Sequence, residues 1–341
     1  MKKIFLFAFC LLPSAFCLAQ DIHFAQLSET PLLLNPALTG EYDGFYRGIL
    51  NYRNQWLSMG KPYSTFMGSF DTPIEMKRRE GGYIGTGINF FSDRAGDSHF
   101  GTTQGNLSVS AILPVNEKSK LSAGLQFGFS QHSLNLSSIQ WPNQYNGQNY
   151  DPNITPNEPY NRNFSFFDLG AGGNYEVITN NGTFTGKEIT KFDLGAAFFH
   201  ATMPIQKFHS GAKETLYGKL IAHTSLRHDF PGTVLGIVPS VVFMMQGPAS
   251  ELNIGALIRY KVNQGTKVTG FYSQSAIAAG LQYRFKDAIS PQFYLELADF
   301  GIGISYDVNV SSYTKNQKST GAFEISIKYA NMKGALRKGM K

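Results

Sequence analysis

The chain has 341 residues, and only 16% of them are charged, whereas 14% are aromatic. Soluble domains usually carry about 25% charged residues, so this composition is poor in charge, and its plentiful apolar residues exclude a disordered chain. The 30 basic and 24 acidic residues leave a net charge of +6. Because the basic residues are spread along the chain, we expect no nucleic acid as a partner.

Residues 1–19 have the organisation of a secretory signal peptide. Lys2 and Lys3 precede a short apolar run, and Cys17 and Ala19 place small residues at the −3 and −1 positions of a cleavage site. A spanning helix needs about 20 apolar residues, so we expect cleavage after Ala19 rather than a membrane anchor.

Removal of the signal peptide would also remove both cysteines, Cys10 and Cys17. The mature chain would then have no thiol for a disulfide, for thiol catalysis or for a cysteine-based metal site. No later segment approaches the roughly 18 consecutive apolar residues of a spanning helix. A mature chain that crosses a membrane must therefore do so as a closed β-barrel.

Apolar and polar residues alternate along most of the chain from residue 45 to residue 329. In 121–130, the odd-numbered residues are all Leu, Ala or Phe, and the residues between them are Ser, Gly or Gln. The stretch 251–262 alternates in the same way with one exception, Leu257, which falls on the polar face. A period of two predicts half-buried β-strands and not helices.

About fourteen such strands are predicted, and many of them have ten residues or more. Strands of soluble proteins usually run five or six residues, whereas a membrane-spanning strand needs about 9–11. The predicted strands lie at 45–56, 62–72, 82–92, 102–113, 119–133, 164–177, 190–201, 216–228, 234–246, 251–262, 276–286, 291–298, 300–310 and 321–329.

The strands of a soluble β-sandwich or jelly roll would alternate as well. The residues on the two faces and the lengths of the loops distinguish these folds from a membrane barrel. The polar faces are rich in Gly, Ser and Asn, and aromatic residues often close the apolar faces, as in the girdles of outer-membrane barrels. Short connections tend to alternate with long ones, which is typical of barrels with short periplasmic turns. The short ones include 229–233 and 298–299, and the long ones include 134–163, 201–215 and 311–321.

The prediction is therefore an all-β fold, a transmembrane antiparallel β-barrel of about 14 strands over residues 45–330. A pre-barrel segment, 20–44, would precede it, and a basic tail, 331–341, would follow it. The connection 263–275 is long where a short turn is expected, so the sequence leaves room for an extra strand there. The Asn-, Pro- and Tyr-rich loop 134–163 is either functional or a poorly ordered surface loop, and the sequence leaves both open.

The sequence indicates no catalytic, cofactor or metal site. None of the seven histidines stands at a metal-ligand spacing with a carboxylate, and there is no GxSxG nucleophile elbow. Charges on the polar faces should pair inside the barrel, which favours a plugged or constricted lumen. These charges are Arg53, Arg227, Arg259, Arg284 and Lys328 with Asp168, Glu176, Asp193, Glu251 and Asp307.

Three ordered motifs near the start resemble one known family. They are NPALTG at 35–40, YRNQW at 52–56 and YSTF at 63–66, and further segments agree at 239–261, 283–288, 303–311 and 321–329. Together they resemble the PorP/SprF family of outer-membrane proteins of Bacteroidetes over essentially the whole mature chain.

The resemblance implies a non-enzymatic outer-membrane component of the type IX secretion system, linked in some members to gliding motility. It implies partners among the periplasmic ring or motor components, a secreted surface protein or large adhesin, and outer-membrane lipid. A porin-like channel for small solutes is the alternative, and an outer-membrane enzyme is a third reading for which no catalytic set is found.

Residues 20–44 could enter the lumen as a plug or stay in the periplasm as a docking arm. Asn35-Pro36 and Gly40 favour a turn, and the apolar run 31–34 needs burial. We expect 31–40 to pack against the part of the first strand that carries Arg53 and Trp56, although these motifs could equally matter only for folding. The candidate plug or partner contacts are Asn35, Pro36, Gly40, Arg53 and Trp56.

Overall fold

The computed structural model describes residues 21–42, 44–56, 62–74, 82–96, 100–134, 140–155, 163–183, 186–207, 214–263, 275–310 and 321–331, with no side chains described at 180–188 and 263. The predicted signal peptide and all but the first residue of the basic tail lie outside the described residues. No helix in the described part of the chain is long and apolar enough to cross a membrane.

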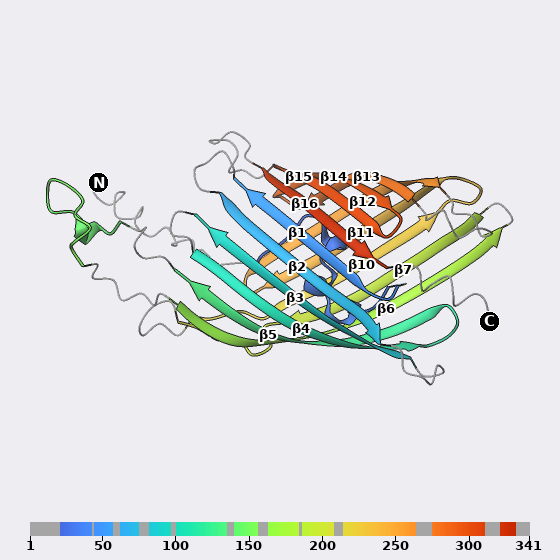
Figure 1. Cartoon of the computed structure of the whole chain (residues 1–341), viewed down its shortest axis with the longest axis horizontal. Coiled ribbons are helices and arrows are strands. Elements are labelled where there is room, and N and C mark those ends of the chain that lie inside the picture. The colour runs from blue at the N-terminus through green and yellow to red at the C-terminus, as the bar shows by residue number, and fades with distance from the viewer. Residues whose placement is uncertain are drawn as a thin grey trace, which may run out of the picture.

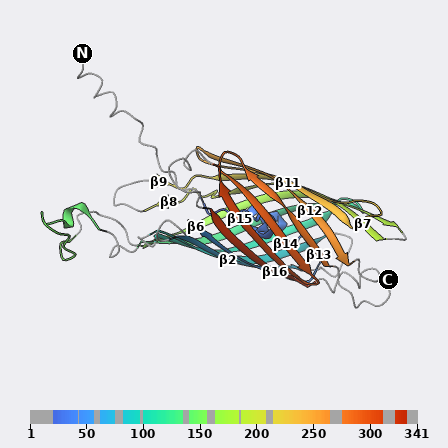
Figure 2. The same cartoon turned by 90° about the horizontal axis from the view of Figure 1, so that it is seen from above.

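Fourteen antiparallel strands form a closed barrel (Figures 1 and 2). Successive strands are neighbours, and β1 closes the ring by pairing with both β2 and β16. The strands are β1 (Arg47–Gln55), β2 (Tyr63–Ile74), β3 (Tyr83–Ala95), β4 (Phe100–Pro114), β5 (Ser119–Ser133), β6 (Asn163–Thr183), β7 (Gly186–Phe199), β10 (Lys219–Asp229), β11 (Leu235–Gln246), β12 (Ala249–Asn263), β13 (Ser275–Arg284), β14 (Ala288–Leu297), β15 (Phe300–Asn309) and β16 (Ala322–Ala330). Two short strands, β8 (Ile205–Gln206) and β9 (Glu214–Thr215), pair with each other within the connection from β7 to β10.

The predicted barrel and its fourteen strands are confirmed, with two differences. An extra barrel strand in 263–275 is excluded, because β12 pairs directly with β13 from Asn253 to Asn263 and leaves no place between them; residues 264–274 lie outside the described residues. The hairpin of β6 and β7 is also longer than predicted, since the ladder continues to the pair Thr183 and Gly186. Backbone pairing extends there through polar residues that carry no hydrophobic alternation.

The two faces of the wall have opposite chemistry. On β5, Leu125 and Phe127 are 54% and 51% exposed on the outside, whereas Ser122 and Gln126 are buried on the inside. Most exposed large apolar side chains of the strands point outward in this way, as the lipid-facing band of an outer-membrane barrel requires.

The two rims differ in their loops. Arg47, where β1 begins, pairs with Ala330, where β16 ends, so the first and last strands meet at one rim, here called the terminal rim. The opposite rim, here called the loop rim, carries the connections 133–163, 199–219 and 309–322. Since outer-membrane barrels have short periplasmic turns and longer extracellular loops, this pattern assigns the loop rim to the outside.

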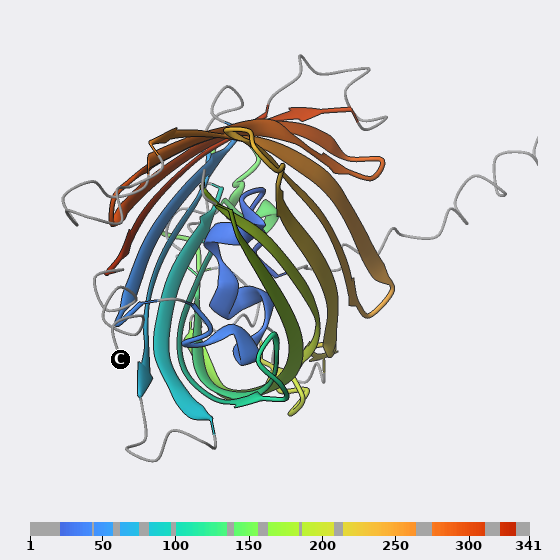
Figure 3. The same ribbon diagram turned by 90° about the vertical axis from the view of Figure 1, so that its right-hand side faces the viewer.

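Residues 21–42, here called the lumen segment, lie inside the ring of strands (Figure 3). The segment forms three single turns, η2 (Leu27–Glu29), α1 (Pro31–Leu34) and η3 (Pro36–Leu38). Proline begins both α1 and η3, where its fixed φ favours a helical turn and its missing N–H leaves no donor unpaired.

Within the loop 134–163, residues 140–155 fold on themselves. η5 (Pro142–Gln144) is followed by an antiparallel bridge between Tyr145 and Tyr150, and Gln144 Nε2 donates to the carbonyl of Ile154 at 2.8 Å. This part of the loop is ordered by its own hydrogen bonds rather than by the barrel wall.

Candidate functional site in the barrel lumen

The lumen segment is anchored by apolar side chains on two separate parts of the wall. Leu27 and Leu34 pack on a cluster from β7, β10 and β11 that includes Phe199 and Ile221. Phe24, with Ile22 and Leu33, packs on Met67 of β2 and Phe91 of β3. The apolar run 31–34 therefore finds the burial that its composition demands, and Leu32 is fully buried.

Asn35 fastens the middle of the lumen segment to β6 and β7. Its buried amide donates to the carbonyl of Gly173 at 2.9 Å and lies 3.0 Å from His223 Nε2, and its Oδ1 accepts the N–H of Ala37 at 2.9 Å. A buried amide in which donor and acceptor are both used fixes position as well as orientation.

Pro36 follows Asn35 and starts η3, which lies directly against β5. A Cβ at Gly124 would fall on the carbonyl group of Pro36, so the wall must carry glycine there for the two backbones to approach. Contacts of η3 with β4, β5 and β6 show that this turn rests on that side of the barrel.

Gly40 makes the turn that leads out of the lumen segment. It has a φ of +69°, a conformation that favours glycine, and its N–H donates to Asp71 Oδ2 of β2 at 2.8 Å. Arg47 Nη2 also binds Asp71 Oδ2, at 2.7 Å, and donates to the carbonyl of Leu38 at 3.2 Å. The end of the segment is thus locked to the first residue of β1.

Arg53 is 3% exposed in its side chain and lies between two carboxylates, Asp307 at 2.9 Å and Glu324. The Glu324 carboxylate also accepts the backbone N–H groups of Ala25, at 2.7 Å, and of Gln26, at 3.1 Å. Arg53 therefore acts on the lumen segment through Glu324.

The expected packing of 31–40 against Arg53 is corrected by these contacts. Residues 25–26 lie near Arg53, whereas η3 lies against β4, β5 and β6 and Gly40 binds Asp71 of β2. The physical reason is that Arg53 needs the two carboxylates of β15 and β16, which leaves the small-residue wall of β4 to β6 to receive the apolar turn.

Trp56 lies at the loop rim, beyond the end of β1. Its backbone N–H donates to the carbonyl of Gly321 at 3.1 Å, and its ring centroid is 4.8 Å from that of Tyr63. The structure thus brings Asn35, Pro36 and Gly40 onto the wall, connects Arg53 to the same segment, and places Trp56 outside this group.

The sequence did not single out Asp21, which holds the other end of the segment. Its carboxylate lies 2.6 Å from His200 Nε2 and 3.4 Å from Lys219 Nζ, and His200 Nδ1 lies 2.7 Å from Asp168. Burial alone would lower the pKa of His200, but the two carboxylates outweigh it and raise the pKa to about 9. His200 also has a φ of +56°, a strained conformation held by these partners. These contacts join residues that are far apart in sequence, so no local pattern announces them.

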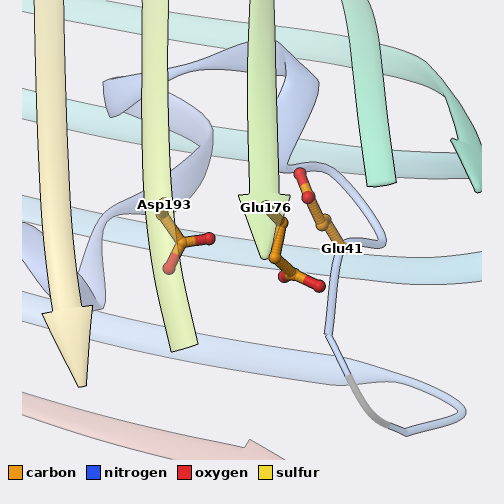
Figure 4. A group of neighbouring side chains, drawn as sticks. All are labelled: Glu41, Glu176 and Asp193. Atoms are coloured by element: carbon orange, nitrogen blue, oxygen red, sulfur yellow. The ribbon is translucent and has the colours of Figure 1, made fainter. Parts of the chain in front are cut away.

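Three carboxylates meet near the terminal rim, where Glu176 and Asp193 of neighbouring strands lie beside Glu41 of the lumen segment (Figure 4). Their oxygens lie within 4.8 Å of one another, an arrangement that could suit a hard cation. Lys191 Nζ already lies 2.7 Å from Glu176 and 3.6 Å from Asp193, and Lys120 Nζ lies 3.0 Å from Glu176. The two ammonium groups therefore offset two of the three carboxylate charges of this cluster.

Glu41 is the carboxylate of this cluster that the lysines do not reach within ion-pair distance. Burial and the neighbouring Glu176 raise its pKa to about 7, although Ser122 Oγ donates to it at 2.7 Å and Asn174 at 3.1 Å. The cluster can therefore take up a proton near neutral pH at the point where the lumen segment meets β6.

A cavity of about 190 Å³ remains beside Glu29, between the lumen segment and the wall from β10 to β16. Arg227, Arg259 and Lys328 line it together with apolar residues, and among these is Leu257, the exception in the alternation of β12. Arg259 pairs with Glu296 at 2.5 Å, and Lys328 pairs with Glu29 at 2.9 Å. In the described part of the chain Arg53, Arg259, Arg284 and Lys328 form ion pairs with carboxylates, as expected, whereas Glu251 accepts a hydrogen bond from Asn253 Nδ2 at 2.7 Å. The space beside Glu29 is polar enough to hold water.

No individually curated protein matches this sequence. Among solved structures, a FadL homologue of Pseudomonas aeruginosa is similar, with 11% identity, a TM-score of 0.47, and coverage of 87% of this chain and 92% of that one. The monoaromatic hydrocarbon channel CymD shows 12% identity, a TM-score of 0.44 and coverage of 88% and 92%. CdiB of Acinetobacter baumannii shows 10% identity and a TM-score of 0.40 over 83% of this chain, which spans 60% of the CdiB chain.

The comparison with protein families is specific. The family described as "Type IX secretion system membrane protein PorP/SprF" matches residues 17–329, which includes the lumen segment and every strand of the barrel up to β16. The chain belongs to the PorP/SprF family of type IX secretion system membrane proteins, and it is an outer-membrane β-barrel.

Proposed function

We propose that this protein is a non-enzymatic component of type IX secretion that supports the export or surface attachment of partner proteins through the rims of a plugged barrel. The observation that carries the proposal is the family match over residues 17–329. The partners would be periplasmic ring or motor components at the terminal rim and a secreted surface protein, such as a large adhesin, at the loop rim. Gliding motility would depend on it where the exported partner is an adhesin used for movement.

The lumen segment supports a role without solute flow. It is pinned by Asn35 to β6 and β7, by Gly40 to β2 and by residues 25–26 to β16. A segment held on several walls at once occupies lumen that an open porin would leave free, so we assign the contacts with partners to the rims.

The second candidate is a porin-like channel for small solutes. The charged, water-accommodating cavity beside Glu29 favours it, because displacement of the lumen segment would extend a polar path along β10 to β16. Conductance of the purified barrel in planar bilayers separates the two readings: a closed wild-type barrel supports the first, and steady conductance supports the second.

The deciding experiment compares surface and culture-medium proteins of cells with and without the gene, with the barrel purified from outer membranes in parallel. Loss of one or a few large surface proteins, together with their recovery on the barrel, indicates a dedicated export or attachment barrel. Loss of the whole exported set places the protein in the core machinery. Unchanged export and surface proteins would overturn the proposal, and re-expression of the wild-type gene is the control.

A further inference from the structure

The first described residue, Asp21, lies at the loop rim of the barrel. Its backbone N–H donates to Oε1 of Gln246, the last residue of β11, at 3.1 Å. Its carboxylate meets His200, which directly follows β7, and Lys219, the first residue of β10. All three partners stand where their strands meet the loop rim.

From there the lumen segment runs to the opposite rim. Residues 25–26 bind Glu324, and Glu29 then pairs with Lys328, which is close to the end of β16 at the terminal rim. The segment crosses to β6 at Asn35 and ends at the terminal rim, where Arg47 begins β1. It thus traverses the length of the barrel in the direction opposite to β1.

The position of Asp21 decides at which rim the lumen segment begins, and this is the loop rim. The long loops assign this rim to the outside of the cell. A chain that enters its first strand from the periplasm therefore has its beginning on the other side of the membrane.

We propose that the mature N-terminus reaches the cell surface through the lumen of its own barrel, and that signal-peptide removal must precede this threading. Hydrolysis of the peptide bond between Ala19 and Gln20 by water leaves a carboxylate on Ala19 and a free amino group on Gln20. Only a released end can pass along the lumen, because a chain still attached to an apolar signal in the inner membrane cannot reach the loop rim. The contacts of Asp21 with His200 and Lys219 fasten the threaded end.

The absence of cysteine from the mature chain makes the test direct. Single cysteines are introduced by Asp21→Cys, by Asn149→Cys in the loop 140–155 and by Glu117→Cys in the turn between β4 and β5 at the terminal rim. Intact cells are treated with a membrane-impermeant maleimide, and the same cells are treated after permeabilisation. We expect labelling of Asp21→Cys and Asn149→Cys in intact cells, and of Glu117→Cys only after permeabilisation.

Two outcomes would overturn the inference. Labelling of Asp21→Cys only after permeabilisation, or only after denaturation, places the N-terminal end away from the surface. Labelling of Glu117→Cys but not Asn149→Cys in intact cells would show that the terminal rim, and not the loop rim, faces the cell surface. Because Asp21→Cys loses the ion pairs with His200 and Lys219, a second variant keeps Asp21 and carries a short epitope tag between Gln20 and Asp21, and antibody binding to intact cells must give the same answer.

The order of events is tested by Ala19→Lys, which removes the small residue that signal peptidase needs at the −1 position. Because the retained signal peptide would keep Cys10 and Cys17, this variant also carries Cys10→Ala and Cys17→Ala, so that Asp21→Cys stays the single thiol. We expect the unprocessed chain to be retained without a seated lumen segment, so the Asp21→Cys reporter is not labelled in intact cells. Surface labelling of an unprocessed chain would contradict the required order. These readouts do not depend on cargo, so surface labelling with normal secretion overturns the proposed function and leaves this inference intact.

Discussion

The two halves of the lumen segment are held by different forces. Residues 21–29 add charged contacts to the apolar packing of Phe24 and Leu27. Asp21 binds His200, Glu29 binds Lys328, and the Glu324 carboxylate accepts the backbone N–H groups of residues 25–26. Residues 30–42 rest on a wall of close backbone contacts and neutral hydrogen bonds, apart from the carboxylates at their end.

Glycines of the wall show how tight the second contact is. A Cβ at Gly85 would fall on the carbonyl of Thr39, and one at Gly172 on the side chain of Asn35. Ion pairs tolerate small movements because the Coulomb energy changes slowly with distance, whereas backbone contacts tolerate almost none. The first half should therefore be released by changes of charge, and the second by added volume.

The largest effect is expected for Glu324→Ala. It leaves Arg53 buried with Asp307 as its remaining carboxylate, which Arg284 shares at 3.0 Å. Breaking a buried pair by removing one partner costs about 3–5 kcal/mol. Unfolding of the purified barrel by denaturant measures the loss of free energy.

The matched control for this change is Glu117→Ala, which removes an exposed carboxylate from the turn between β4 and β5. Surface substitutions of this kind usually stay within about 0.5 kcal/mol. Equal stability of the two variants would show that the charge network around Arg53 does not hold the first half.

A smaller loss is expected for Gly124→Ala, because the added methyl meets the backbone of Pro36 and Ala37 and not a flexible side chain. Overpacking of this kind typically costs about 1–3 kcal/mol. We expect η3 to leave the wall, with lower stability and the appearance of conductance in planar bilayers.

Gly105→Ala serves as the control on the neighbouring strand, since a Cβ there meets nothing within 4 Å. If both alanine variants remain closed and equally stable, steric fit is not what seats the second half.

Asn35→Ala should cost about 1–2 kcal/mol, because the Ala37 N–H and the nitrogen of His223 lose their partner in a buried place. Asn35→Asp should be worse at neutral pH, since a carboxylate would then face the carbonyls of Gly173 and Ala196. Thermal unfolding of both variants beside the wild type checks the order, and an Asp variant as stable as wild type would contradict the donor role of this amide.

The smallest effect is a dependence on pH. The pKa of Glu41 is raised to about 7 from about 4.5, so its contribution to seating is complete below pH 4.5 and is lost as the pH rises through 7. The pKa of His200 is raised to about 9 from 6.5, so the contribution of the first half is complete below pH 6.5 and is lost only as the pH rises through 9. As the pH rises from 4.5 to 6.5, Glu41 loses part of its contribution while His200 keeps its own, so the second half should loosen before the first.

Glu41→Gln isolates this effect because the amide can still accept from Ser122 and Asn174 but no longer titrates beside Glu176, Asp193, Lys191 and Lys120. Protection of the lumen segment from proteolysis, followed from pH 5 to pH 8, should fall for the wild type and stay level for the variant. If the protection of the wild type does not change over this range, the titration of Glu41 does not control the seating of the lumen segment.

The strands, the barrel class and the resemblance to the family could all be predicted from the amino-acid sequence. Alternation with a period of two is a local property, so it can be read without any knowledge of which strands pair. The parity of short and long connections was also readable, and the motif NPALTG contained three of the residues that touch the wall. The sequence also showed that Leu257 interrupts the alternation of β12. The structure gives the reason, because Leu257 lines the cavity beside Glu29.

The path of the lumen segment and its contacts could not be predicted from the sequence and became clear from the folded barrel. Ala25 and Glu324 are separated by 299 positions, and Asp21 and His200 by 179, so their contacts follow from closure of the ring and not from any local preference. The predicted packing of 31–40 against Arg53 was wrong for the same reason. The carboxylates that bind Arg53, Asp307 and Glu324, come from strands near the end of the chain. The interior of a barrel is lined by strands from the whole chain. The shape and charge that the lumen segment must match therefore exist only in the closed barrel.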